Sequence, residues 1–393
     1  MTSRTVVIVA AKRTPLGAFQ GQFSSLSASD LGAHAIKAAL DSIPLEKGQI
    51  NSVHMGCVLP AGQGQAPARQ AAIKGGVSLS TPCNTVNKMC GSGMQTAIYA
   101  YNEILSGEAD CVVAGGMESM TNAPYLLPSA RGGQKMGNAT MQDHMFCDGL
   151  QDVKHGKLMG SFAEMCADKF SFTREQQDDF AISSLDHANH ATQTGAFENE
   201  ITPVTVKTRK GETTFSVDEQ PGNAVIDKIR GLRPAFKKDG TVTAANSSSI
   251  SDGAAALVLM DADEASKQGF KPLAKITAHA TYADDPDWFS TAPIYAIEQL
   301  LCKCNWQLDE VDLFEINEAF AVVTMAAIKE LNLDASKVNV NGGACALGHP
   351  IGASGARIIV TLLHALKARN LNKGVASLCI GGGEATAIAI EII

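Results

Sequence analysis

The fold class can be read from residues 87–116, NKMCGSGMQTAIYAYNEILSGEADCVVAGG. A glycine-rich turn comes first, and apolar residues at helical spacing follow it, among them Met94, Ile98 and Tyr101. The apolar run from Cys111 to Ala114 then predicts a buried strand. The stretch therefore predicts a turn, a helix and a strand in succession, which is the unit that α/β domains repeat.

A second copy of this unit lies near the end of the chain. Leu378-Cys379-Ile380-Gly381-Gly382 parallels Val112-Val113-Ala114-Gly115-Gly116, and each segment follows a helix that opens with a glycine-rich turn. This local similarity suggests two related α/β halves, and we expect mostly parallel strand pairing. The expected strands are residues 5–10, 111–114, 274–278, 311–316, 338–341 and 375–380, and the expected helices are residues 30–40, 320–331 and 355–366.

The middle of the chain differs from both halves. From residue 119 to about residue 246 it is rich in proline, glycine, methionine and charge. A long polar helix should begin after Thr173, because Thr173-Arg174-Glu175-Gln176 has the capping-box pattern. Two short strands, residues 202–207 and 213–218, should follow. The pattern favours a subdomain inserted between two similar halves.

Composition limits the classes of function. The 393-residue chain is 45% hydrophobic and 18% charged, which is typical of a compact globular protein with two or three domains or subdomains. Its formal net charge of -8 disfavours general nucleic-acid binding, and without 18 consecutive apolar residues it is not expected to span a membrane. The apolar residues 5–11 predict a strand and not a signal peptide, and the ten scattered cysteines fit a reducing compartment, so a cytoplasmic protein is expected.

Cys90 is a candidate nucleophile because it stands at the entrance of the predicted helix. Backbone N–H groups and the positive end of the helix dipole favour thiolate over thiol at such a place. Gly91 and Gly93 would let a substrate approach closely. A buried structural cysteine is the competing interpretation and the commoner state of a lone thiol. Other segments must therefore decide between a nucleophile and a structural cysteine.

Three further segments carry polar or reactive groups at strand ends or turns. His349 lies in a turn that contains glycine and proline; a lone histidine is more often structural, but its ordinary pKa near 6.5 suits proton transfer. Cys379 ends a strand before three glycines, and Asn317 follows another strand. Two thiols, an imidazole and an amide in these positions predict covalent acyl transfer, with a nucleophile, bases and oxyanion donors.

Taken together, these segments resemble the motifs of the thiolase family. The similarity runs essentially from Val6 to Ile392 and includes Lys12-Arg13-Thr14-Pro15-Leu16-Gly17 and Gly115-Gly116-Met117-Glu118-Ser119-Met120. It implies an α/β thiolase fold, with two similar βαβαβαββ halves in a layered α-β-α-β-α arrangement and an inserted loop domain. The expected domains are an N-terminal half of residues 1–118, an inserted loop domain of residues 119–248 and a C-terminal half of residues 249–393.

The resemblance implies a role for each candidate residue. Cys90 would attack an acyl-CoA thioester and carry the acetyl group, with His349 as its base. Cys379 would take the α-proton of the second acetyl-CoA. One oxyanion site would consist of His349 and a water held by Asn317, and the other would consist of the backbone N–H groups of Cys90 and Gly381.

The resemblance also implies where coenzyme A binds. It would lie across the inserted domain, with its pantetheine running down a tunnel to Cys90. Lys228, Arg230 or Arg233 would supply positive charge near its nucleotide end, unless each is a solvated surface charge. The expected substrate-binding residues are Leu158, Met159, Lys228, Ser248, Ala319 and Phe320.

Two positions depart from the family pattern. Leu158 stands before Met159-Gly160, where members specific for acetoacetyl-CoA commonly carry histidine. An aliphatic side chain changes the polarity and shape of the acyl pocket and leaves the acyl chain length undecided. Glu384 follows the three glycines where Gly-Met-Gly is frequent, and the sequence offers no physical account of it.

The implied reaction is a Claisen condensation of two acetyl-CoA molecules to acetoacetyl-CoA and CoA, together with the reverse thiolysis. The alternatives are a 3-ketoacyl-CoA thiolase of broader chain length in fatty-acid β-oxidation and a non-catalytic acyl-CoA- or lipid-binding thiolase-like protein. CoA thioesters would be substrates, and no cofactor, metal, nucleic acid or membrane partner is expected. A homotetramer, built as a dimer of dimers with residues 122–141 as the contact loop, is expected by similarity.

Overall fold

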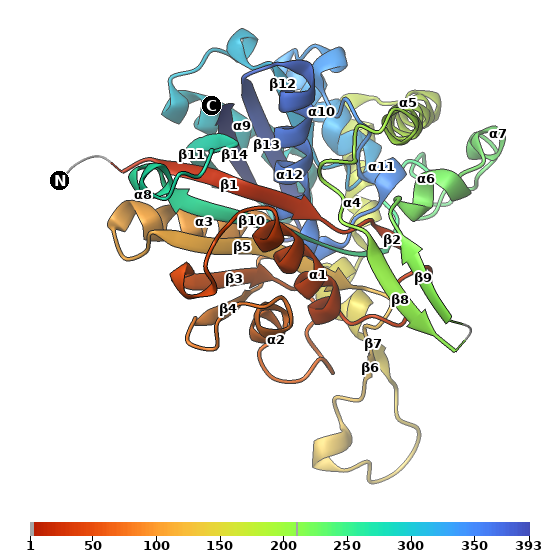
Figure 1. The fold of residues 1–393 in the computed structure, drawn as a ribbon. Helices are drawn as coiled ribbons and strands as arrows, with labels where there is room; N and C mark the ends of the chain where they lie inside the picture. Colours follow the sequence, from red (N-terminus) through yellow and green to blue (C-terminus); the bar gives the residue numbers. More distant parts are fainter. Residues whose placement is uncertain (1–3, 210) are drawn as a thin grey trace.

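One mixed β-sheet organises the chain. A computed structural model describes residues 4–209 and 211–393 (Figure 1). The sheet has the strand order β12-β13-β14-β11-β1-β10-β5-β3-β4, and β2 pairs with β10. These strands are β1 (Val6–Arg13), β2 (Gly17–Ala18), β3 (Ser52–Gly56), β4 (Cys83–Val86), β5 (Cys111–Ser119), β10 (Ser251–Asp261), β11 (Ala274–Ala283), β12 (Leu313–Ile316), β13 (Lys373–Ile380) and β14 (Glu384–Ile392).

Helices lie on both faces of this sheet, and two small antiparallel ribbons lie outside it. The ribbons are β6 (Tyr125–Leu126) with β7 (Gln142–Asp143) and β8 (Val204–Thr208) with β9 (Gly211–Phe215). The helices are α1 (Ala28–Asp41), α2 (Pro67–Lys74), α3 (Ser92–Ser106), α4 (Met159–Phe170), α5 (Arg174–Gln193), α6 (Glu219–Asn223), α7 (Ile226–Ile229), α8 (Ala262–Lys267), α9 (Ala292–Cys304), α10 (Ala321–Leu331), α11 (Ala344–Leu347) and α12 (Ile351–Arg369).

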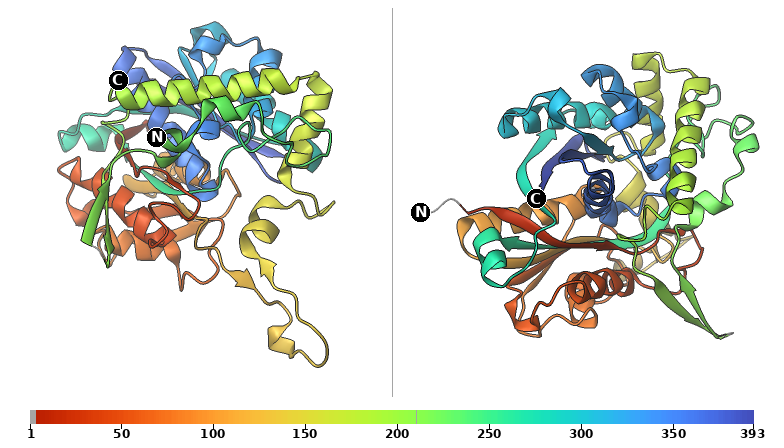
Figure 2. Two further views of the ribbon diagram at one scale, coloured as in Figure 1. Left: turned by 90° about the vertical axis from the view of Figure 1, so that its right-hand side faces the viewer. Right: turned by 45° about the horizontal axis from the view of Figure 1, so that its top comes forward.

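Helices α3 and α12 form the central layer of the molecule (Figure 2, right). Their apolar side chains pack against β1, β5 and β10 on one side and against β13 and β14 on the other. Helices α1 and α2 cover the outer face of the first half of the sheet, and α4, α9 and α10 cover the outer face of the second half. The expected α-β-α-β-α layering is therefore confirmed.

The sheet is less parallel than the sequence predicts. Strand β10 is antiparallel to both β1 and β5, and β14 is antiparallel to both β13 and β11. The expectation of mostly parallel pairing is wrong because these two strands, which the helix–strand alternation did not reveal, insert between the others. Strand β10, although it follows residue 249, lies among the strands of the N-terminal half; the three-domain division stays a prediction.

Residues 338–341 do not form the expected strand. Val338 makes a single bridge to Phe314, and Asn339 has a φ of 48°, which turns the chain. The Asn339 side chain replaces the missing ladder: its Oδ1 accepts from the Ile316 N–H at 2.8 Å, and its Nδ2 donates to the Ile316 carbonyl at 2.8 Å. A side-chain amide thus satisfies the edge of β12 in the way a neighbouring strand would.

The inserted region packs onto the sheet and also projects from it. Thr173 caps α5, and its capping box with Gln176 is present as predicted. Ribbon β8–β9 covers the N-terminal half through Val204, Val206 and Phe215. The segment between β6 and β7 reaches away from the body of the protein (Figure 2, left).

Helix α12 is long and apolar enough, by length and composition alone, to cross a membrane. However, 83% of its most apolar window is buried inside the protein, where it forms the central layer with α3. Its hydropathy is therefore explained by its place in the core. Among the described residues no other helix meets the same criterion.

Helices α3 and α12 touch through backbone atoms. A Cβ on Gly93 would lie 2.7 Å from the Ala356 nitrogen, and a Cβ on Gly355 would overlap the Met94 backbone. Only a residue without a side chain fits at either place, because backbone atoms cannot move aside as a flexible side chain can. The two glycines therefore set how closely the N-terminal ends of the two helices approach.

We expect Gly355→Ala to lower the free energy of unfolding by about 2 kcal/mol, because overpacking a core against rigid atoms costs about 1–3 kcal/mol. The urea midpoint of the purified variant measures this loss. Gly132→Ala is the matched control, since no atom lies within 4 Å of the added Cβ there. Equal midpoints for the two variants would contradict the argument.

Candidate active site

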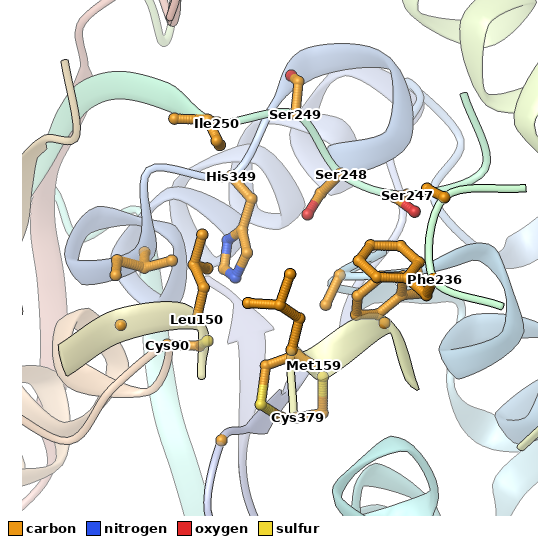
Figure 3. A pocket seen from close by; sticks show the side chains of 18 of the residues that line it. Cys90, Leu150, Met159, Phe236, Ser247, Ser248, Ser249, Ile250, His349 and Cys379 are labelled. Atoms are coloured by element: carbon orange, nitrogen blue, oxygen red, sulfur yellow. The ribbon is translucent and has the colours of Figure 1, made fainter. Parts of the chain in front are cut away.

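Three of the four side chains predicted to take part in catalysis lie on one cavity of about 370 Å³ (Figure 3). Cys90 precedes α3, His349 precedes α12, and Cys379 is the penultimate residue of β13. The imidazole of His349 and the sulfur atoms of Cys90 and Cys379 point into this cavity. The close approach of the two helices therefore brings the nucleophile and base candidates together, although their chemical roles stay predictions.

The turn before α3 is fixed by Ser92. Its hydroxyl donates to the Met89 carbonyl at 2.6 Å and accepts from the Lys88 N–H at 2.9 Å. Met89 has a φ of 47°, in the left-handed region that non-glycine residues rarely adopt. The chain is thus bent sharply just before Cys90, which holds the thiol at the cavity wall.

Burial dominates the acidity of Cys90. It raises the pKa of the thiol to about 11, the nearby Glu118 carboxylate adds to the increase, and the N–H groups of Gly381 and of Cys90 itself oppose it. The N–H groups favour thiolate, as the sequence predicts, but burial outweighs them, so the resting group is a thiol. The same two N–H groups remain well placed to stabilise negative charge that develops beside this sulfur.

His349 is held as a neutral imidazole with a free acceptor nitrogen. Ser354 donates its hydroxyl hydrogen to the Pro350 carbonyl at 3.0 Å, so the Nδ1–H of His349 must donate to the Ser354 oxygen, 2.6 Å away. The Nε2 atom is buried and has no hydrogen-bond partner among the described residues. Burial, reinforced by the Arg357 charge, lowers the pKa of His349 to about 3. Nε2 is therefore unprotonated at neutral pH, and its lone pair is available to a group in the cavity.

Asn317 is positioned by a buried ion pair. The Arg357 guanidinium donates to Glu315 at 2.9 Å and to the Asn317 Oδ1 atom at 3.5 Å. The Asn317 backbone N–H donates to the Ser377 carbonyl at 3.0 Å. Its Nδ2 atom is buried without a partner among the described residues and is free to donate. Asn317 does not itself line the cavity wall.

Cys379 is the more deeply buried of the two thiols. Burial raises its pKa well above the ordinary value, and the proximity of Cys90 raises it further. Two negatively charged sulfur atoms side by side are unfavourable, so the pair loses at most one proton at neutral pH. The turn after β13 begins at Gly381, which also lines the cavity.

Most of the predicted substrate-binding residues lie on the same cavity. Ser248 donates its backbone N–H to the Ala319 carbonyl at 3.0 Å, and the His349 N–H donates to the Ser249 carbonyl at 3.0 Å. The segment that contains Ser248 and Ser249 therefore connects the part of the wall with Ala319 to the part with His349. These walls are largely apolar. The residues on the cavity are Cys90, Met120, Phe146, Gly149, Leu150, Leu158, Met159, Gly160, Ala235, Phe236, Ala244, Ser247, Ser248, Ser249, Ile250, Phe289, Ala319, Phe320, His349, Ile351, Cys379 and Gly381.

The three candidate cations lie outside this cavity. Lys228 lines a neighbouring cavity of about 320 Å³, which shares Ala244 and Ser249 with the first. Arg230 instead forms an exposed ion pair with Asp179, and Arg233 is exposed at the surface. Lys228 is therefore the candidate best placed to meet a ligand that extends from the first cavity into the second.

Glu118 supports the site, although the sequence motifs predicted no role for it. Its buried carboxylate accepts N–H groups from Val58 at 2.9 Å, from Leu59 at 3.1 Å and from Gly352 at 2.8 Å. The last contact ties β5 to the first turn of α12. Burial raises the pKa of Glu118 to about 7. An acidic residue within an apolar strand, as in Gly116-Met117-Glu118-Ser119, is the sequence signal that could have indicated this role.

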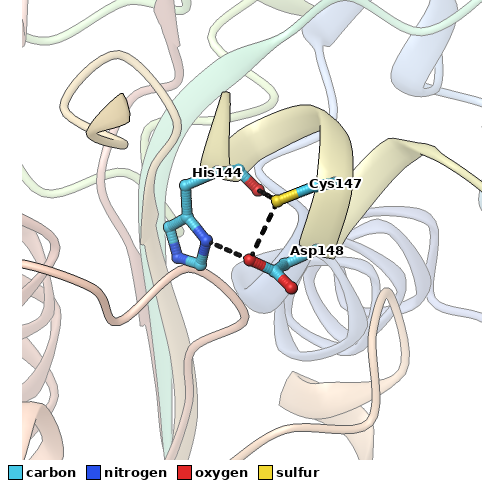
Figure 4. Close-up of side chains that lie close together, drawn as sticks. All are labelled: His144, Cys147 and Asp148. Carbon is cyan, nitrogen blue, oxygen red and sulfur yellow. Dashed lines mark hydrogen bonds and ion pairs between the residues drawn. The ribbon is translucent and has the colours of Figure 1, made fainter. Parts of the chain in front are cut away.

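A cluster of metal-binding residue types lies in the segment that also contributes Phe146 and Gly149 to the cavity wall (Figure 4). The ligand atoms of His144, Cys147 and Asp148 lie within 4.8 Å of one another. His144 Nδ1 and Asp148 are 2.6 Å apart, the Cys147 thiol donates to Asp148 at 3.2 Å, and the Ala61 N–H donates to His144 Nε2 at 3.4 Å. Nδ1 therefore carries the proton, and the cluster holds the turn that presents Phe146 to the cavity.

Comparison with known proteins agrees with this geometry. A family model of the thiolase N-terminal domain matches residues 6–263, and one of the thiolase C-terminal domain matches residues 270–392. The chain is 49% identical to a Cupriavidus necator protein named acetyl-CoA acetyltransferase, over 98% of this chain and 99% of that protein. It is 48% identical to a Schizosaccharomyces pombe protein of the same name over the full length of both. The crystal structure of the Bacillus anthracis acetyl-CoA acetyltransferase superposes with a TM-score of 0.97 at 40% identity, covering 100% of this chain and 99% of that one.

The raised pKa of Cys90 predicts slow alkylation at neutral pH. Because the thiolate fraction grows tenfold per pH unit below the pKa, the rate of Cys90 alkylation by iodoacetamide should rise about tenfold per unit from pH 7 to about pH 9.5, without a plateau. Mass spectrometry of the peptide that contains Cys90 measures the rate. The labelled peptide should be missing in the Cys90→Ser variant, which identifies it. A plateau below pH 9 would show that the thiol is more acidic than its burial implies.

Proposed function

The chain belongs to the thiolase family, and on that premise we propose that it is an acetyl-CoA acetyltransferase. It joins two acetyl-CoA molecules into acetoacetyl-CoA and free CoA and also catalyses the reverse thiolysis. The observation that carries this proposal is the convergence of Cys90, His349 and Cys379 on one cavity. The names of the full-length relatives support the choice of acetyl-CoA as substrate.

The first half-reaction transfers an acetyl group to Cys90. Its Sγ atom bonds to the thioester carbonyl carbon, and the bond from that carbon to the CoA sulfur breaks. Since the resting pair is a thiol and a neutral imidazole, the proton passes from Sγ to His349 Nε2 as the new bond forms and then moves to the CoA sulfur. The N–H groups of Cys90 and Gly381 stabilise the carbonyl oxygen, and such a donor contributes about 10²- to 10³-fold in rate.

The second half-reaction uses Cys379 as the base. Once Cys90 is acetylated it can no longer ionise, so the repulsion that helps to raise the pKa of Cys379 is gone. His349 takes the Cys379 proton, and the Cys379 thiolate then removes the α-proton of the second acetyl-CoA. The resulting carbanion bonds to the acetyl carbon, the Cys90 sulfur leaves, and His349 returns its proton to that sulfur. The His349 N–H and a water on Asn317 Nδ2 would stabilise the enolate oxygen.

Coenzyme A would occupy the two adjoining cavities, whose walls the inserted region helps to form. Its pantetheine would pass Ser248 and Phe320 toward Cys90, and its phosphates would lie near Lys228 in the adjoining cavity. The mainly apolar walls suit the alkyl parts of pantetheine, and Lys228 supplies a positive charge for the phosphates.

A thiolase that accepts a broader range of acyl chain lengths is the second candidate function, and one observation favours it. Leu158 lines the cavity beside Leu150 and Phe146, which makes this part of the wall apolar. Such a wall would accept a longer acyl chain. Comparing thiolysis rates for C4 substrates with those for C8 to C16 substrates separates the two functions, and higher activity on the longer chains would favour a 3-ketoacyl-CoA thiolase.

We expect the purified protein to consume acetoacetyl-CoA in the presence of CoA. The loss of the 3-oxoacyl absorbance measures this reaction. Cys90→Ala should lower the rate by at least about 10³-fold while the circular dichroism spectrum stays unchanged, because the variant lacks the sulfur to which the acetyl group would bond. If the wild-type protein causes no loss of absorbance, the proposed function is wrong. Substantial turnover by Cys90→Ala would refute the assignment of the nucleophile.

The proposal extends to assembly and location. We propose a homotetrameric, cytoplasmic enzyme. Exposed apolar side chains on the projecting segment support assembly: Tyr125 is 66% exposed, Met136 91% and Met141 64%. Several large apolar side chains exposed on one projecting segment fit a surface that another subunit covers. All ten cysteines are free, which fits a reducing compartment.

We expect sedimentation velocity to show a tetramer for the wild-type protein and a dimer for Met136→Glu combined with Met141→Glu, because buried charge would disfavour the contact. The double variant should retain thiolysis activity, since neither residue lines the cavity. A wild-type protein that sediments only as a monomer or a dimer would overturn the proposed assembly.

A further inference from the structure

Glu384, which departs from the family pattern, forms an ion pair with Lys88. Lys88 belongs to the turn that precedes Cys90, and Glu384 is the first residue of β14, directly after the turn that contains Gly381. The ion pair therefore joins two loops that lie almost 300 positions apart in the chain. Each of these loops contributes one of the N–H groups that act on the Cys90 sulfur.

The same two loops also touch through apolar atoms. A Cβ on Gly91 would overlap the side chain of Ile380, so Gly91 and Ile380 are in close contact. In the β13–β14 pairing Ile380 lies opposite Glu384. The contact of Gly91 with Ile380 limits how closely the loops approach, and the ion pair of Lys88 with Glu384 holds them at that distance.

We propose that Lys88 and Glu384 are positioning residues that fix the N–H groups of Cys90 and Gly381 relative to each other for acyl transfer. The inference rests on the proposed function. The step concerned is acetylation: the carbonyl carbon bonds to Cys90 Sγ, its bond to the CoA sulfur breaks, and the proton of Sγ reaches the CoA sulfur through His349. During this step the negative charge on the carbonyl oxygen needs both N–H groups at once.

A purely stabilising role would give a different result. The Lys88 side chain is 22% exposed and the Glu384 side chain 34%, and ion pairs that water reaches contribute little to stability. Alignment of two donors is more sensitive, because small displacements of catalytic groups cost large factors in rate. The pair should therefore affect acetylation far more than unfolding.

The first experiment measures acetylation directly in Glu384→Gln. Rapid mixing with acetyl-CoA and detection of released CoA give the rate of the first half-reaction. We expect this rate to fall about tenfold, since a displaced oxyanion donor loses part of the 10²- to 10³-fold that a donor contributes. The KM for acetyl-CoA should stay within about twofold, because neither Lys88 nor Glu384 lines the cavity.

Glu391→Gln is the matched control. Glu391 lies near the other end of β14 and forms an ion pair of 2.8 Å with Lys275, with side-chain exposures of 25% and 38%. Its removal deletes a similar charge pair from the same strand, away from the two loops. Acetylation by this variant should equal that of the wild-type protein, and its urea midpoint should match that of Glu384→Gln.

A double-mutant cycle provides the decisive comparison. Lys88→Met should slow acetylation as much as Glu384→Gln, and the double variant should be no slower than either single variant, because all three lack the same ion pair. The exchanged pair, Lys88→Glu with Glu384→Lys, should recover most of the rate. Unchanged acetylation in Glu384→Gln, strictly additive losses, or an equal loss in Glu391→Gln would overturn the inference. A wild-type protein that releases no CoA would instead refute the proposed function.

Discussion

The contact between the backbones of α3 and α12 is the constraint on which the rest of the structure depends. Gly93 and Gly355 allow the two helices to touch at their N-terminal ends, where Cys90 and His349 precede them. Both halves of the sheet then close over the helix pair from opposite sides, which buries it and gives the five layers. The site is thus a direct result of core packing: the same approach that completes the hydrophobic core brings a thiol and an imidazole to one cavity.

Deep burial determines the chemical state of that site. It keeps the Cys90 thiol protonated and His349 neutral, so the resting cavity holds few formal charges. Charge appears only during reaction, beside N–H groups that are already fixed in place and in surroundings that screen them weakly. The buried carboxylates are treated differently. Glu315 has the guanidinium of Arg357 as its partner, and Glu118 has three backbone N–H groups, so each has partners that offset part of the cost of its burial.

Local patterns predicted much of this arrangement, and tertiary contacts account for the misses. Periodicity and glycine-rich turns identified α3, α12 and the strand that carries Cys379, because these signals are local. The net acidity of Cys90 could not be predicted, because the helix entrance is visible in the sequence and the depth of burial is not. Residues 338–341 have a strand-like composition, yet the Asn339 side chain takes the place of backbone pairing. The partner of Glu384 was invisible because Lys88 lies in another part of the chain.

The central position of α12 has a consequence for how the chain is made. Helix α3 and the strands of the N-terminal half expose the apolar face that α12 covers until residue 369 has been synthesised. At a translation rate of about 5–20 residues per second, that face stays uncovered for tens of seconds after α3 leaves the ribosome. The nascent protein is therefore a natural client for chaperones that shield apolar surface, and a chain truncated before α12 should aggregate instead of folding into a stable half.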